Sequence, residues 1–211
     1  MQDAQYLWLL PGVAVYFVGV WVRSWRWHYL LRPLKRVPTR VMFPIVTIGY
    51  MGNNIYPARA GEILRAIVLK RREEIPVSAS LATIIIERIF DGVVMLAFVF
   101  LNLNELARLT QDSGFLGNIQ DLALIGAAAF LGALLIFMLA AMFPSTTQKW
   151  IERILSLLPE KWSGRVQPVV ERFLTGLEAL RSPRDAVMVL LTSTLIWLLE
   201  TGKYWFVMHA F

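Results

Sequence analysis

Cysteine is absent from the 211 residues, and histidine occurs only at His28 and His209. The chain therefore has no disulfide framework, thiol nucleophile or cysteine metal site, and a histidine metal centre is not expected. A glycine-rich phosphate loop followed by lysine and a serine elbow between glycines are also missing. We accordingly predict no catalytic residues, no metal, no cofactor and no enzymatic activity.

Charge is also scarce, because 17% of the residues are charged and 57% are hydrophobic. That is more apolar surface than a water-soluble domain of this size can bury. The runs 122–143 and 187–199 contain no charge at all, and a membrane-spanning helix needs about 20 apolar residues. The two-residue alternation of membrane strands is missing. We predict an all-α, polytopic transmembrane helix bundle.

The formal net charge is +6, which in a soluble protein would raise the question of nucleic acid. Here six cations follow the first apolar segment, where the positive-inside rule places the cytoplasm. We therefore predict that the first helix ends on the cytoplasmic side and that nucleic acid is not a partner. The six residues are Arg23, Arg26, Arg32, Lys35, Arg36 and Arg40.

Four apolar segments are predicted to span the membrane within a single domain, residues 1–211, that we expect to be incomplete at both ends. The loop 102–121 contains three acids and one base, which is typical of an external segment. Residues 144–185 alternate charges with apolar residues at helical spacing, which predicts cytoplasmic amphipathic helices. The four segments are Tyr6–Trp27, Ser78–Leu101, Leu122–Phe143 and a last span that begins near Ala186.

A shorter apolar stretch, Val41–Tyr56, is interrupted by proline, glycine and asparagine. Basic residues flank the region at Arg40 and again at Lys70, so both flanks should lie on the cytoplasmic face. This pattern predicts a re-entrant hairpin or broken helix. Irregular backbone at membrane depth is tolerated only where it is buried in protein or lines a wet cavity. We therefore expect the candidate site in this hairpin.

The sequence GNNIYPARAGEILR, residues 52–65, carries the chemistry of the hairpin. Pro57 suits the start of a helix, so we predict that a half-helix begins around Ala58–Gly61. Its unpaired amides and positive dipole end would then point into the membrane and favour an anion.

Two arginines add fixed positive charge to this helix start. Arg59 and Arg65 can each hold a phosphate with two hydrogen bonds, and Glu62 lies three residues from both and can orient them. Asn53 and Asn54 supply further donors and acceptors. The alternative is a self-satisfied network of arginine and glutamate that only closes a break between helices.

A second motif, IIIERIFDG at residues 84–92, places Glu87 and Asp91 one turn apart on a helix face, with Arg88 beside them. We expect this face to pack against the hairpin and its acids to balance the hairpin arginines; the alternative is an ion pair that fixes helix packing. In the last span, Glu200 and Lys203 are interpreted as neutralising each other. The predicted substrate-binding residues are Asn53, Asn54, Arg59, Glu62, Arg65, Glu87, Arg88 and Asp91.

Three segments follow one another in order: RSWRWHYLLRPL at 23–34, GYMGNNIYPARAGEILRA at 49–66 and SASLATIIIERIFDG at 78–92. In these residues the chain resembles the lysylphosphatidylglycerol synthase transmembrane family, also called flippase-like membrane proteins. The resemblance implies a membrane domain that moves amphiphilic lipids between leaflets, such as aminoacyl-phosphatidylglycerol or polyprenyl lipid carriers. It does not imply synthase activity, because the soluble domain of the synthases is absent from this sequence.

We hypothesise a lipid flippase for anionic or phosphate-bearing lipids, located in a prokaryotic inner membrane as a multi-pass protein. Membrane lipids would be its partners, and their phosphate would bind at the hairpin. One alternative is a membrane-embedded lipid-phosphate transferase with Glu87 or Asp91 as general base. Another is a non-catalytic scaffold of an envelope-synthesis complex. The lipid, the direction and energy coupling of transport, and homo-oligomer formation are left open.

Overall fold

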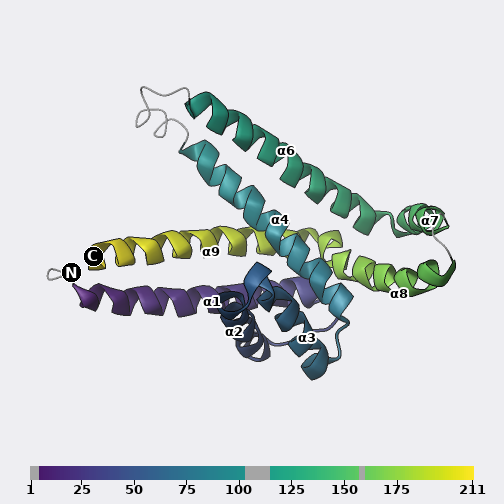
Figure 1. Ribbon diagram of the computed structural model, residues 1–211, viewed down its shortest axis with the longest axis horizontal. Helices are drawn as coiled ribbons and strands as arrows, with labels where there is room; N and C mark the ends of the chain where they lie inside the picture. The colour runs from purple at the N-terminus through teal and green to yellow at the C-terminus, as the bar shows by residue number, and fades with distance from the viewer. Residues whose placement is uncertain (1–4, 103–114, 157–159) are drawn as a thin grey trace.

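The computed structural model describes residues 5–102, 115–156 and 160–211 (Figure 1). All regular elements of these residues are helices, which confirms the predicted all-α class. The elements are η1 (Tyr6–Trp8), α1 (Leu9–Leu31), α2 (Thr39–Ile55), η2 (Pro57–Arg59), α3 (Gly61–Glu73), α4 (Val77–Leu101), α6 (Phe115–Met142), α7 (Pro144–Leu155), α8 (Glu160–Gly176), η3 (Leu177–Arg181) and α9 (Pro183–Ala210).

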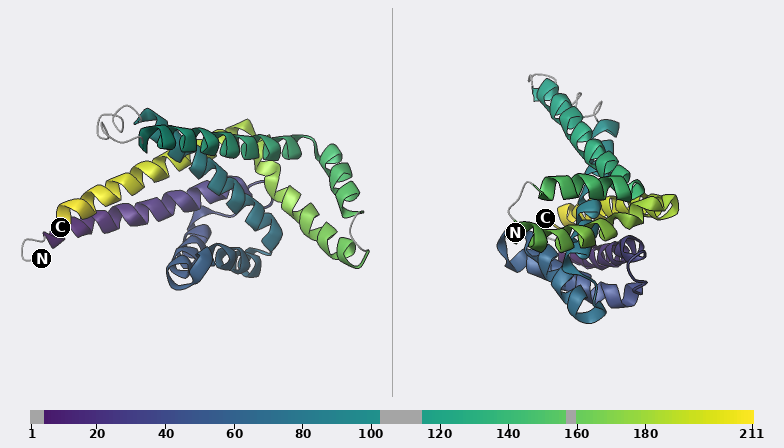
Figure 2. Two further views of the ribbon diagram at one scale, coloured as in Figure 1. Left: turned by 45° about the horizontal axis from the view of Figure 1, so that its top comes forward. Right: turned by 90° about the vertical axis from the view of Figure 1, so that its right-hand side faces the viewer.

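The first and the last long helices of the chain, α1 and α9, lie side by side and antiparallel (Figures 1 and 2). They contain 23 and 28 residues, so each is long enough to cross the roughly 30 Å apolar core of a membrane. Aromatic rings join their outer ends, where Trp8 packs edge-on against Trp205 at 5.7 Å between ring centroids. Among the described helices, α2 packs against α1, and α4 packs against α9 more than against α1. The helices α3, α6 and α8 then pack against α4.

Three segments of the described residues are long and apolar enough to span a membrane: Tyr6–Leu31, Ala123–Met142 and Pro183–Ala210. They correspond to three of the four predicted spans, although α6 begins at Phe115, seven residues before the predicted start. The fourth, α4, has 25 residues but carries Glu87, Arg88 and Asp91 in its inner half. Most of the loop predicted to be external, residues 103–114, lies outside the described residues.

The predicted hairpin consists of α2 and α3, which run antiparallel below α4 in Figure 1. Their helices are separated by η2, where Ala58 and Arg59 adopt left-handed backbone angles with φ of 57° and 55°. The second helix begins at Gly61, within the predicted range. The hairpin and its half-helix are therefore confirmed as structural elements.

Glycine makes the close contact between the two hairpin helices possible. A Cβ atom on Gly52 of α2 would lie 2.9 Å from the Cα of Gly61, and one on Gly61 would lie 2.5 Å from the amide nitrogen of Asn53. Distances this short are not found for real Cβ atoms. Any side chain at Gly61 must therefore push α3 away from α2.

Two amphipathic helices follow α6, as predicted. Figure 1 shows α6 from the side but α7 end-on, so the chain turns sharply after Met142. The exposed side chains of α7 include Trp150 and Ile154. The C-terminal end of α8 packs against the start of α4, where Gly176 lies directly against the backbone of Ala79. Their cytoplasmic location stays a prediction.

The antiparallel hairpin leads to a topological prediction. Arg40 at the start of α2 and Lys70 near the end of α3 lie at the same end of the hairpin, next to the α1–α2 connection, where Lys35 binds Glu73 at 2.9 Å. Single cysteines at positions 40 and 70 of this cysteine-free chain should therefore react with a membrane-impermeant maleimide from the same side. A cysteine at Tyr6, at the other end of α1, should react from the opposite side. Labelling of positions 40 and 70 from different sides would contradict the hairpin topology.

Candidate functional site

A buried arginine of α1 stands at the centre of the charged residues. Arg26 has no exposed surface and donates to Glu87 from Nη2 at 2.8 Å and from Nε at 3.2 Å. It also donates to Asp91 on α4 and, at 2.8 Å, to the hydroxyl of Ser193 on α9. Arg26 thus links α1, α4 and α9. It is therefore buried within the bundle rather than exposed beyond the end of the span, and the cytoplasmic location of this end of α1 stays a prediction.

The hairpin contributes a second arginine to the same acids. Arg65 of α3 donates to Glu87, and its guanidinium carbon lies 4.6 Å from the centre of the Trp27 ring. Arg88 reaches Asp91 at 3.4 Å and Glu62 at 3.6 Å. These contacts place the charged face of α4 against the hairpin, as the sequence predicted.

The inner cluster, defined as Arg26, Glu62, Arg65, Glu87, Arg88 and Asp91, contains three cations and three anions and is therefore balanced. This corrects two sequence expectations. Glu62 does not hold Arg59 and Arg65 but lies against Arg88. Arg59 does not pair with the acids of α4 either: it is exposed and makes no ion pair with the described residues. The acids of α4 balance Arg26 and Arg65 instead.

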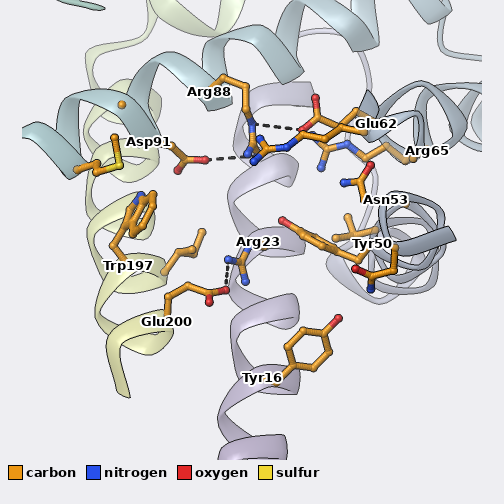
Figure 3. A pocket seen from close by; sticks show the side chains of 18 of the residues that line it. Tyr16, Arg23, Tyr50, Asn53, Glu62, Arg65, Arg88, Asp91, Trp197 and Glu200 are labelled. Carbon is orange, nitrogen blue, oxygen red and sulfur yellow. Dashed lines mark hydrogen bonds and ion pairs between the residues drawn. The ribbon is translucent and has the colours of Figure 1, made fainter. Parts of the chain in front are cut away.

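A cavity of about 870 Å³ opens beside this cluster, between the hairpin, α1, α4 and α9 (Figure 3). Seven of the eight predicted site residues line it, and the eighth, Glu87, is buried behind them. Their role in ligand binding stays a prediction. The charged and amide residues of the lining are Arg23, Asn53, Asn54, Arg59, Glu62, Arg65, Arg88, Asp91, Glu200 and Lys203.

A second charged group lies closer to the N-terminus of α1 than Arg26 does, and below the inner cluster in Figure 3. Arg23 donates to Glu200 of α9 at 2.5 Å, and Lys203 donates to the other oxygen of the same carboxylate. The predicted pairing of Glu200 with Lys203 is confirmed, but it is incomplete because Arg23 is a second cation on that acid. We call Arg23, Glu200 and Lys203 the outer cluster.

Several residues that line the cavity have buried polar atoms without a hydrogen-bond partner. Among the described residues, four buried side-chain atoms have no hydrogen-bond partner, and all four belong to residues that line it. Three are N–H donors, the Nε atoms of Arg65 and Arg88 and the indole nitrogen of Trp197; the fourth is the amide oxygen of Asn53. Buried donors are normally paired, so this surplus of donors fits a ligand that accepts hydrogen bonds.

Sequence reasoning missed Arg23, Arg26 and the aromatic residues Tyr50 and Trp197. A usable signal was present, because Arg26 lies inside the predicted span Tyr6–Trp27 and is followed by further apolar residues at Tyr29, Leu30 and Leu31.

Comparison with known proteins identifies the family of the chain. A family model described as the lysylphosphatidylglycerol synthase TM region matches residues 1–211. The chain belongs to this family. As a member of the lysylphosphatidylglycerol synthase transmembrane family it is a membrane protein, and the resemblance found in its motifs is confirmed. No solved structure matches the chain.

This family member is similar to several curated archaeal proteins. Glycosyltransferase AglD of Haloferax volcanii is 29% identical over 91% of this chain and 34% of its own length. A UPF0104 membrane protein of Methanocaldococcus jannaschii is 32% identical over 36% of this chain and 24% of its own length. Another, of Methanothermobacter thermautotrophicus, is 34% identical over 44% of this chain and 29% of its own length. The chain therefore spans about a quarter to a third of these relatives.

The Haloferax relative contradicts the prediction that the chain has no enzymatic activity. A protein similar to nearly the whole of this family member is named as an enzyme. The prediction rested on the absence of a few known enzyme motifs, and that absence does not exclude other kinds of active site. We therefore withdraw it.

Proposed function

We propose that the cavity binds the phosphate of a membrane lipid and that the chain moves this lipid between leaflets. The observation that carries the proposal is the excess of positive charge in a cavity among apolar helices. The inner cluster is balanced, but Arg59 has no acidic partner among the described residues, and the outer cluster has two cations for one acid. Unpaired charge within a membrane is costly, and an anionic ligand removes that cost.

The composition of the cavity wall supports an amphiphilic ligand. The hairpin and α1 contribute mainly charged and amide groups, whereas Met95, Phe130 and Ile196 from α4, α6 and α9 form an apolar part of the lining. A phosphate could lie against Arg59, Arg65 and Arg88 while the acyl chains follow the apolar side. The start of α3 also faces the cavity and has no side-chain cap, which favours an anion there.

Arg59 offers the clearest test because it is exposed and holds no helix in place. Arg59→Gln should leave the free energy of unfolding within about 0.5 kcal/mol of wild type. It should weaken binding of a phosphate lipid by about tenfold, since charge-assisted hydrogen bonds contribute roughly 1.5–3 kcal/mol. The measurements are calorimetric titration with farnesyl monophosphate and flipping of fluorescent phosphatidylglycerol in vesicles containing the purified protein.

Arg71→Gln is the matched control, because it removes the same charge from the exposed far end of α3, outside the cavity lining. It should bind and flip lipid like wild type. If Arg59→Gln also flips at the wild-type rate, the anion site is not used and the scaffold hypothesis takes its place.

A second candidate function is a membrane-embedded transferase that acts on a lipid phosphate. It is favoured by the name of the Haloferax relative, a glycosyltransferase similar to most of this chain. Asp91 is the better general base, because its carboxylate lines the cavity whereas Glu87 is fully buried. Formation of a modified lipid phosphate by the wild type but not by Asp91→Asn would favour this function over transport alone. For either function we propose a prokaryotic cytoplasmic membrane, in keeping with the archaeal relatives.

A further inference from the structure

We propose that the outer cluster is a second anion subsite, which takes a second negatively charged group of the same lipid head group, as in a lipid diphosphate. The inference rests on the proposed phosphate site, and it adds that the ligand carries two negatively charged groups. It assigns a ligand to Arg23, Glu200 and Lys203, of which the sequence indicated only Glu200 and Lys203 as a self-neutralising pair.

The contacts of the outer cluster leave donors free to face the cavity. Glu200 accepts one hydrogen bond from Arg23 and one from Lys203. A guanidinium has five N–H donors and an ammonium has three, so most donors of both cations have no described protein partner. The three side chains line the cavity and are 11–22% exposed. They are accessible to a ligand, in contrast to Arg26.

The charge of the cluster argues against a purely structural ion pair. A packing pair needs one cation for each acid, and burying a second cation among apolar helices costs at least about 2.5 kcal/mol on insertion scales. Aromatic rings lie beside both cations, with Arg23 5.1 Å from the centre of the Tyr50 ring and Lys203 4.6 Å from that of Tyr204. These rings attract a cation but carry no net charge, so the additional positive charge is not neutralised. A second anion accounts for it.

Independent support comes from Trp197 on α9. Its indole N–H is buried without a hydrogen-bond partner, and the residue lines the cavity. In Figure 3 its side chain lies near Glu200, at the level between the two clusters. A buried N–H donor in the lining of a cavity that also contains Arg23 and Lys203 is suited to an acceptor oxygen such as that of a phosphoryl group.

The spacing of the clusters limits the ligand. The two clusters meet on α1, where Arg23 and Arg26 are three residues apart, about 4.5 Å along the helix axis. Arg26 itself is buried, but Arg65 shares Glu87 with it. Arg88 likewise shares Asp91 with Arg26, so the cavity-facing cations of the inner cluster lie close to that level of the helix. Two adjacent phosphoryl groups fit so short a separation, whereas charges at opposite ends of a long head group do not. The ligand class that best fits both clusters is therefore a lipid with two neighbouring phosphoryl groups.

Farnesyl monophosphate and farnesyl diphosphate provide the test, because they share a tail and differ by one phosphoryl group. Calorimetric titration of the purified protein should show about tenfold tighter binding of the diphosphate. In Lys203→Met, the remaining Arg23–Glu200 pair is neutral, so the diphosphate should lose its advantage over the monophosphate. The double variant Lys203→Met, Glu200→Gln leaves Arg23 uncompensated and should regain the preference for diphosphate.

Each outcome separates the inference from the function on which it rests. Equal binding of the two lipids by the wild type would overturn the second subsite and leave the phosphate site standing. Binding of neither lipid more tightly than farnesol would overturn the phosphate site itself. Failure of the double variant to regain the preference, with wild-type thermal stability, would show that Lys203 acts through packing rather than charge.

Discussion

Glu87→Gln should destabilise the protein by about 3–5 kcal/mol, because it removes the acid that two buried arginines share. Glu87 accepts hydrogen bonds from Arg26 and Arg65, and the side chains of all three are at most 4% exposed. Glutamine preserves the shape of the side chain, but it has no negative charge to neutralise the two guanidinium groups. The measurement is equilibrium unfolding in detergent, followed by circular dichroism.

The matched control is Glu178→Gln, which removes an acid from an exposed pair with Arg181 at 3.7 Å. Exposed pairs contribute roughly 0–1 kcal/mol, so this variant should unfold near the wild-type midpoint. A double-mutant cycle of Glu87→Gln with Arg65→Gln should also lose less than the two single changes together. Strictly additive losses would show that this ion pair does not hold α3 against α4.

Gly61→Ala should destabilise the hairpin by about 1–3 kcal/mol and also weaken phosphate binding. The added methyl group collides with the backbone of α2 at Asn53. The first turn of α3, which carries Glu62 and Arg65, must then move away from the cavity. Unfolding in detergent and titration with farnesyl monophosphate measure the two effects.

Gly132 of α6 provides a control, because a change to alanine there should not lower the stability of the protein. A Cβ atom there meets no other atom within 4 Å, and alanine is favoured over glycine within a helix by roughly 0.5–1 kcal/mol. Gly132→Ala should therefore be neutral or stabilising. If Gly61→Ala behaves in the same way, the close approach of α2 and α3 does not determine the geometry of the site.

The elements of the fold follow largely from local sequence. Long uncharged runs predicted the spans, and Pro57 with the following glycine predicted where the hairpin breaks and α3 begins. These features depend on residues close together in the chain. They could be read without knowing how the helices pack.

The partners of the charges could not be predicted in the same way. Helical spacing places Glu62 near Arg59 and Arg65, but the crossing of α3 and α4 brings Arg88 to Glu62 and Glu87 to Arg65. Arg26 was assigned by counting charges at the end of a span, which cannot separate an arginine at the membrane surface from one turned inward. Such pairings depend on tertiary contacts between segments far apart in the chain.

The separation of these partners along the chain has a consequence for biosynthesis. Arg26 pairs with Glu87 across 61 residues, and Arg23 pairs with Glu200 across 177 residues. At about 5–20 residues per second, the ribosome delivers Glu200 about 9–35 seconds after Arg23. During that time α1 must hold Arg23 without its native acid, whereas Arg26 waits only about 3–12 seconds for Glu87 at the same rate. The position of both arginines near the C-terminal end of α1 allows their side chains to reach toward the membrane surface. Final docking of α1 therefore waits for the last helix to be made.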